Sequence, residues 1–124
     1  MTSIRFELFV TNLEKSVDFY TRLLGFNIVK KSANYASLQR EEVIIGIGSQ
    51  TALSNDHYFQ PEIEIARKGL GVETVLEVED IEAEHKKFAD ANYPLECELT
   101  LQRWGLTDFR LVDPNGYYIR ITTH

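Results

Sequence analysis

The residue types that most often carry out chemistry in proteins, histidine and cysteine, are few and widely spaced in this chain. His57, His85 and His124 are its three histidines, and Cys97 is its one cysteine. A divalent metal site needs about three ligands from His, Cys, Asp or Glu, and no two of these histidines have the spacing of such ligands. Because no His or Asp partner is placed near Cys97, a small buried apolar role is favoured over a nucleophile. These four residues indicate neither a metal centre nor a nucleophilic site.

Carboxylate and guanidinium groups recur instead within segments that alternate polar and apolar residues. Arg5 and Glu7 share one such segment, Glu73 opens another, and Arg120 lies in the last. A guanidinium fork matches a carboxylate or phosphate group, and a positioned carboxylate can act as a proton-transfer base. Charged residues also occupy the solvated faces of half-exposed strands. The pattern alone leaves both interpretations open.

The first half of the chain predicts one strand, one helix and three further strands. Residues 4–10 alternate with a period of two, which is typical of a strand. Asn12 can cap a helix whose apolar residues follow at helical spacing, and Gly25 lies where that helix would end. The next three strands are predicted at residues 26–31, 35–39 and 43–49.

The second half repeats this order after a connecting segment, residues 50–71, in which we expect a short strand near Ile63–Ile65. A shift of about 68 positions pairs Asn12 with Asp80, which can cap a second helix. Strands are predicted at residues 72–78, 95–102, 108–112 and 117–122, with Asp113-Pro114-Asn115-Gly116 as the last turn.

Size and composition exclude several classes of protein. A chain of 124 residues fits a single domain. The net charge of -6 and the scattered basic residues argue against a nucleic-acid partner. No apolar run approaches the length that spans a membrane, and the first residues lack the pattern of a secretory signal. With its one cysteine, the chain is expected to be soluble and cytoplasmic.

Three stretches resemble a known superfamily. Residues 9–26 are similar to the opening strand and helix of the vicinal-oxygen-chelate (glyoxalase/bleomycin-resistance) proteins, and residues 71–81 to the opening of their second module. Trp104-Gly105, Asp108-Phe109 and Asp113–Gly116 resemble the closing stretch of the bleomycin-resistance-like branch. The resemblance implies an α+β fold in which two tandem βαβββ modules form a curved mixed sheet around a cleft. We expect one domain over residues 1–124, with modules at 3–49 and 72–123 and a linker at 50–71.

The resemblance also indicates where metal-dependent members would hold their ion. The four ligand positions fall on Arg5, Ile45, Glu73 and Arg120, of which Glu73 alone can ligate a cation. We therefore expect neither a metal site nor a cofactor.

In the same family these strand faces look into the cleft, so the resemblance suggests a set of ligand-binding residues. An ion pair of Glu73 with Arg5 or Arg120 would stand where the metal is absent, and aromatic rings would line the pocket. Trp104 and Phe9 could equally belong to the hydrophobic core, as we expect for Phe6. The predicted set is Arg5, Glu7, Phe9, Glu73, Trp104, Phe109, Tyr118 and Arg120.

Three functions are compatible with these residues and with the resemblance. The first is a metal-independent protein that sequesters a planar aromatic or anionic small molecule, as resistance proteins do. The second is a lyase, isomerase or dioxygenase of the same superfamily that uses Glu73 as a base. The third is a structural or regulatory dimer whose cleft is filled by its own side chains. In each case the resemblance suggests a homodimer.

Overall fold

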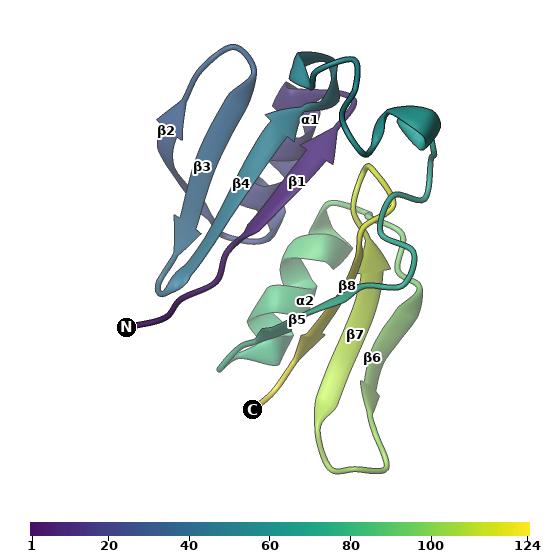
Figure 1. The fold of residues 1–124 in the computed structure, drawn as a ribbon. Helices are drawn as coiled ribbons and strands as arrows, with labels where there is room; N and C mark the ends of the chain where they lie inside the picture. Colours follow the sequence, from purple (N-terminus) through teal and green to yellow (C-terminus); the bar gives the residue numbers. More distant parts are fainter. The chain divides into compact units, whose positions relative to one another are not determined.

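The same β-α-β-β-β order of elements occurs twice along the chain, once in residues 1–65 and once in residues 66–124 (Figure 1). The structure is a computed structural model that describes all residues from Met1 to His124. It confirms the predicted α+β fold with two tandem βαβββ modules. The linker predicted at residues 50–71 is shared between the two units, which divide between Ile65 and Ala66.

The N-terminal unit is a four-stranded sheet with a helix on one side. Its strands pair in the order β1-β4-β3-β2, with β1 parallel to β4 and the other pairs antiparallel. Its elements are β1 (Phe6–Val10), α1 (Leu13–Asp18), the π-helical turn η1 (Phe19–Leu23), β2 (Asn27–Lys31), β3 (Tyr35–Arg40), β4 (Val43–Ser49) and the 3-10 turns η2 (Gln50–Ala52) and η3 (Gln60–Glu62).

Local sequence explains where the first helix begins and what it covers. The side chain of Asn12 accepts a hydrogen bond from the Lys15 amide at 3.0 Å, which satisfies a free N–H of the first turn. α1 packs on β3 and β4, where Leu38 and Ile47 are fully buried. Burial of such side chains is the main source of this unit's stability.

The C-terminal unit has the same topology, with its strands in the order β5-β8-β7-β6. Asp80 caps the helix by accepting from the Ala83 amide at 3.1 Å. The helix packs on the third strand of the unit, and Phe88 of the helix and Leu111 of the strand are fully buried. The elements are β5 (Glu73–Glu77), α2 (Ile81–Asp90), β6 (Cys97–Leu101), β7 (Thr107–Val112) and β8 (Tyr118–Thr122).

The connecting segment differs from its prediction. Residues Ile63–Ile65 form no strand, and the segment holds two short 3-10 turns instead. No neighbouring strand offers Ile63–Ile65 a hydrogen-bond ladder. No helix of the structure has both the length and the apolar character needed to cross a membrane.

Candidate functional site

Polar side chains gather on the outer face of the C-terminal sheet, the face that points away from α2. Along β7, Asp108 and Arg110 alternate with the buried core residues Phe109 and Leu111. In the antiparallel register Arg110 lies directly opposite Arg120 of β8. Side chains of paired residues point to the same face, so the sheet places two guanidinium groups side by side.

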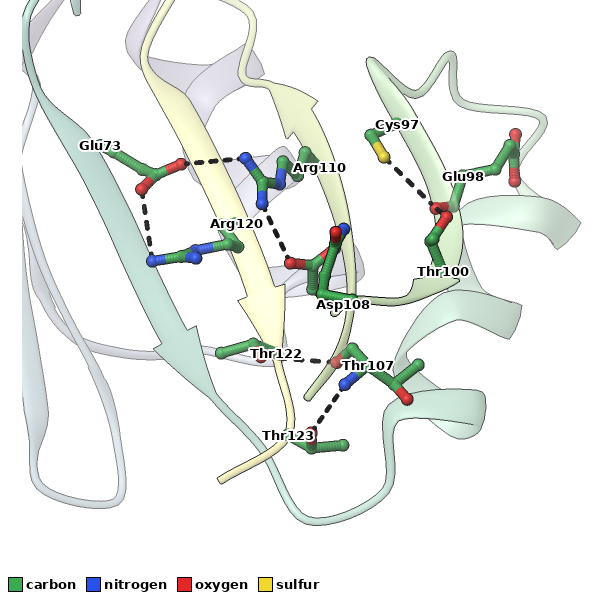
Figure 2. A network of polar contacts seen from close by, with 11 residues as sticks. Glu73, Cys97, Glu98, Thr100, Thr107, Asp108, Arg110, Arg120, Thr122 and Thr123 are labelled. Atoms are coloured by element: carbon green, nitrogen blue, oxygen red, sulfur yellow. Dashed lines mark hydrogen bonds and ion pairs between the residues drawn. The ribbon is translucent and has the colours of Figure 1, made fainter. Parts of the chain in front are cut away.

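The carboxylate of Glu73 on β5 faces both guanidinium groups, as Figure 2 shows. Its Oε1 is 3.4 Å from Nη2 of Arg120, and its Oε2 is 3.8 Å from Nη1 of Arg110. The predicted ion pair between Glu73 and Arg120 is therefore present. A second guanidinium, which was not predicted from the sequence, completes the arrangement.

Asp108 supports Arg110 from the other side. Its side chain is fully buried and accepts hydrogen bonds from Gln102 Nε2 at 2.9 Å and from Arg110 Nη2 at 3.2 Å. Partial burial of Arg110 lowers its pKa, but the hydrogen bonds with Asp108 and Tyr118 outweigh that effect and raise the pKa overall. The Nε atoms of Arg110 and Arg120 are buried and have no hydrogen-bond partner. Each of the two arginines thus has an N–H group from which neither carboxylate of the cluster accepts a hydrogen bond.

A hollow of about 690 Å³ lies at the end of the sheet where β5 begins. Glu73 and Tyr118 line it from the sheet, and Glu96 from the segment before β6. Its remaining walls are residues of the segment before β5, of the end of β7 and of the β7–β8 turn: Ala66, Arg67, Gly69, Leu70, Gly71, Val72, Val112, Asp113, Pro114 and Gly116. The hollow combines apolar residues such as Leu70, Val72 and Pro114 with four charged ones, Arg67, Glu73, Glu96 and Asp113.

Two close backbone contacts hold the wall of this hollow in place. The Lys68 amide donates to the Asn115 carbonyl and the Gly69 amide to the Gly116 carbonyl, each at 3.1 Å. Gly116 has a φ of +90°, and a Cβ there would lie 2.5 Å from the Ala66 carbonyl oxygen. Only glycine fits this position, so the turn residue predicted from sequence also anchors the segment before β5.

The outer face of the N-terminal sheet carries a second polar group. The Tyr35 hydroxyl lies 3.0 and 3.1 Å from the two carboxylate oxygens of Glu7, and Arg5 Nε lies 3.6 Å from the same carboxylate. Burial and the hydrogen bond with Glu7 raise the pKa of Tyr35. Gly46 is the register partner of Glu7, and a Cβ there would overlap both Glu7 Oε2 and the Tyr35 hydroxyl oxygen. The missing side chain therefore makes room for this contact.

Phe9 lies on the same face and contacts the connecting segment of its own unit. Its ring centroid is 5.7 Å from that of Phe59 and 6.2 Å from that of His57. Gly48 is paired with Phe9, and a Cβ there would approach the Phe9 ring to 3.1 Å. Phe9 is half-buried under these rings, so the connecting segment takes part in this face.

Two positions differ from their predicted places, and a third, Trp104, lies apart from the hollow, so its role in ligand binding stays a prediction. Phe109 was predicted to bind ligand, but its side chain is fully buried on the helix side, edge-on to Phe88 and His85. Trp104 is 50% exposed in the turn between β6 and β7 and does not line the hollow. Ile45 was assigned to the cleft-facing set, but it pairs with Phe6 and is buried on the helix side. The family resemblance suggested Phe109 and Ile45 for the cleft, whereas the strand period of two places both on the helix side.

Two site residues that were not predicted had a recognisable signal in the sequence. Asp108 and Arg110 alternate with Phe109 and Leu111, and a buried pair of apolar residues in a strand puts the residues between them on the opposite face. Tyr35 had no such signal, because its contact with Glu7 depends on the pairing of β3 with β4 and on Gly46.

The positions that hold a metal in the resemblance do not suit one here. The carboxylate of Glu73 already faces two permanently charged guanidinium groups, which would repel a cation. No group of three or more His, Cys, Asp or Glu side chains in the structure could hold a metal ion. The two guanidinium groups, by contrast, have the charge and the donors to bind an anionic group.

Solved structures with the same fold are numerous. A glyoxalase/bleomycin resistance protein/dioxygenase from Nocardioides is 17% identical, with a TM-score of 0.78 over 99% of this chain and 83% of its own. A bleomycin resistance determinant encoded on the transposon Tn5 is 23% identical, with a TM-score of 0.70 over 99% and 98% of the two chains. A bleomycin-binding protein complexed with bleomycin is 22% identical, with a TM-score of 0.69 over 100% and 99%. These likenesses show the fold. No curated protein matches the chain.

The family model described as "Glyoxalase/Bleomycin resistance protein/Dioxygenase superfamily" matches residues 3–121, which is nearly the whole sequence. The paired βαβββ modules and the match along their full length agree. The chain belongs to the glyoxalase/bleomycin resistance protein/dioxygenase superfamily.

Proposed function

We propose that this protein binds a planar aromatic or anionic small molecule without the help of a metal, and sequesters it. The observation that carries the proposal is the pair of guanidinium groups, Arg110 and Arg120, which lie side by side and both face Glu73, a residue that lines the hollow. A carboxylate or phosphate on a ligand is the natural partner of such a pair.

In this proposal the ligand's anionic group replaces the carboxylate of Glu73. Both contacts of Glu73 are long for charge-assisted hydrogen bonds, at 3.4 and 3.8 Å. A ligand oxyanion that approached more closely would make stronger bonds with the same donors. The ring or chain of the ligand would lie against the hollow's apolar walls, which include Leu70, Val72 and Pro114.

The comparisons support sequestration as the form of this binding. Two structural neighbours are described as a bleomycin resistance determinant and as a bleomycin-binding protein. A protein that confers resistance by holding a compound needs affinity and no catalytic groups. That requirement fits a site whose exposed carboxylate, Glu73, already faces two arginines.

A lyase, isomerase or dioxygenase that uses Glu73 as its base is the second candidate. The observation in its favour is that Arg110 and Arg120 are placed to stabilise a negative charge that develops on a substrate beside Glu73. Against it, each carboxylate oxygen of Glu73 already faces a guanidinium. Turnover of an α-hydrogen-bearing carbonyl compound that is lost in Glu73→Gln would favour the enzyme.

We further propose that the protein is a cytoplasmic homodimer. Both β1 and β5 are edge strands of their sheets, and apolar side chains on or beside them are exposed, including Ile4, Phe6 and Val72. Exposed apolar groups at unpaired edges favour association with another copy. Sedimentation analysis would measure the oligomeric state.

The experiment that tests the proposed function is a thermal-shift screen of purified, metal-stripped protein. Divalent Ni, Zn and Fe salts form one arm, and planar aromatic drugs and small carboxylates form the other. A ligand that binds only the native state stabilises it by roughly 2.7 kcal/mol at about a hundred times its dissociation constant. The proposal predicts stabilisation by organic compounds without metal, and stabilisation by metal ions alone would contradict it.

A further inference from the structure

We propose that the N-terminal unit carries a second binding site of opposite preference, which takes a planar aromatic cation. Glu7 supplies the charge, and the rings of Phe9, His57 and Phe59 supply the contact surface. All of these residues belong to the unit of residues 1–65. The inference is independent of the anion site proposed for the C-terminal unit.

The three rings form a mutually packed cluster that remains accessible to solvent. His57 and Phe59 lie 4.7 Å apart between centroids, and both pack on Phe9. Phe59 is 44% exposed, and the neighbouring Tyr58, whose centroid is 6.1 Å from that of Phe59, is 90% exposed. Aromatic rings are usually buried for their apolar area, so exposed rings in a cluster indicate a contact surface. The negative face of a ring attracts cations.

The backbone fixes the orientation of the His57 ring in this arrangement. The Phe59 amide donates to His57 Nδ1 at 3.1 Å. A nitrogen that accepts a hydrogen bond carries no proton, so Nε2 is the N–H nitrogen in the neutral form of the ring. A neutral imidazole adds a flat aromatic surface without repelling a positively charged ligand.

Glu7 adds a fixed negative charge to the same face. Glu7 and Phe9 are two residues apart on β1, which separates their Cα atoms by about 6.5–7 Å and points their side chains the same way. The Tyr35 hydroxyl holds the Glu7 carboxylate over Gly46. A fixed carboxylate near aromatic rings can contact the charged atom of a flat cation while the rings contact its face.

Arg5 does not cancel this charge. Its Nε lies 3.6 Å from the Glu7 carboxylate and its side chain is 64% exposed, so the pair is weak and a ligand cation can replace it. The whole chain carries a net charge of -6, which favours the approach of cations over anions. Charge complementarity therefore selects a cationic ligand for this site.

Three ring-matched probes test the inference on the full chain at pH 8. N-methylquinolinium is the cation, quinoline is its neutral counterpart, and 2-naphthoate is an anion. Fluorescence titration should show that N-methylquinolinium binds about 5- to 10-fold more tightly than quinoline, the discrimination expected of one partly exposed charge. Binding of the cation no tighter than that of quinoline would overturn the proposal.

Two variants assign the preference to named residues. Glu7→Gln should abolish the preference for the cation and leave quinoline affinity unchanged, whereas Phe59→Ala should weaken both probes. Glu42→Gln removes an exposed carboxylate of the same unit and is the matched control, for which no change is expected. A preference that survives in Glu7→Gln would refute the role of Glu7.

Binding results for this cation site can be distinguished from those for the anion site of the C-terminal unit. Circular dichroism confirms that each variant is folded, and Tyr35→Phe, which frees the Glu7 carboxylate without removing it, should reduce the preference only in part. The affinity of 2-naphthoate should not change in Glu7→Gln. Loss of binding for the cation alone would therefore leave the proposed function standing, and loss for the anion alone would leave this inference standing.

Discussion

Arg110 on β7 and Arg120 on β8 are register partners in the middle of the C-terminal sheet, so two like charges lie directly opposite each other. Such a pair is destabilising by itself. Glu73 offsets it by facing both guanidinium groups, and the buried Asp108 binds Arg110 from behind (Figure 2). Two positive and two negative groups make the cluster neutral, and the partly exposed carboxylate is the one that a ligand can replace.

Glu73→Gln should tighten the binding of an anionic ligand while it lowers stability. The variant removes the carboxylate that competes with the ligand for the two guanidinium groups. It also removes the negative charge that offsets most of the repulsion between them. Because Glu73 is about one-third exposed, we expect a loss of only about 1 kcal/mol in the free energy of unfolding. Urea unfolding and titration with 2-naphthoate measure the two effects. Weaker binding of 2-naphthoate in the variant would indicate that Glu73 contacts the ligand directly.

Asp108→Ala should be more destabilising than any change to Glu73. Asp108 is fully buried and binds Gln102 and Arg110, so its removal leaves the Gln102 amide without its acceptor and the partly buried Arg110 without its nearest carboxylate. We expect a loss of about 2–3 kcal/mol, seen as a lower urea midpoint with an unchanged slope. Asp90→Ala is the control, because Asp90 pairs with Lys86 at the exposed surface and should change stability by less than about 0.5 kcal/mol.

Phe109→Ala and Trp104→Ala should differ widely in their effect on the free energy of unfolding. Phe109 is fully buried against Phe88, so truncation should lower the free energy of unfolding by about 3–5 kcal/mol. Trp104 is half-exposed in a turn, and we expect a loss of under about 1 kcal/mol. Thermal unfolding monitored by far-ultraviolet circular dichroism compares them. A small effect of Phe109→Ala would contradict its placement in the core.

Tyr93 should make the protein sensitive to alkaline pH. Its hydroxyl donates to the Val112 carbonyl at 2.6 Å, and burial, with a smaller effect of Asp113, raises its pKa to about 12. Between pH 10 and pH 12 the unfolded chain loses this proton while the folded chain keeps it. The unfolded state then binds fewer protons, so stability falls as pH rises, by up to roughly 2 kcal/mol for this group.

Tyr93→Phe isolates this contribution. The variant loses a hydrogen bond worth about 1 kcal/mol at neutral pH, and its stability should then fall less steeply than that of the wild type between pH 10 and pH 12. Urea midpoints measured at several pH values make the comparison. Parallel curves for the two proteins would show that Tyr93 keeps an ordinary pKa in the folded state.

Local patterns predicted the order of elements well, because capping and strand periodicity act over a few residues. Asn12 and Asp80 cap the two helices as expected, and the strand predicted at residues 43–49 has those bounds in the structure. The Asp113–Gly116 turn also lies where its composition placed it. The prediction at Ile63–Ile65 failed because a strand requires a partner, which a local pattern does not reveal.

The candidate site was less predictable, because it depends on which residues become neighbours across strands. Glu73 and Arg120 were identified together, but Arg110 was missed and Phe109 was placed on the wrong face. Both errors have one cause: a shift by one residue reverses every side chain of a strand. The contact of Phe9 with Phe59 joins residues 50 positions apart (59 minus 9) and follows from the path of the connecting segment.

The central claim is that Arg110 and Arg120 bind an anionic ligand without a metal. Isothermal titration of metal-stripped protein with 2-naphthoate, for the wild type and for Arg120→Gln, tests it most directly. We predict that the wild type binds in the presence of a chelator, and that Arg120→Gln, once circular dichroism shows that it is folded, binds about tenfold or more weakly, the loss expected when a charge-assisted hydrogen bond is removed. Equal affinities for the two proteins, or binding by the wild type that requires added metal, would contradict the account.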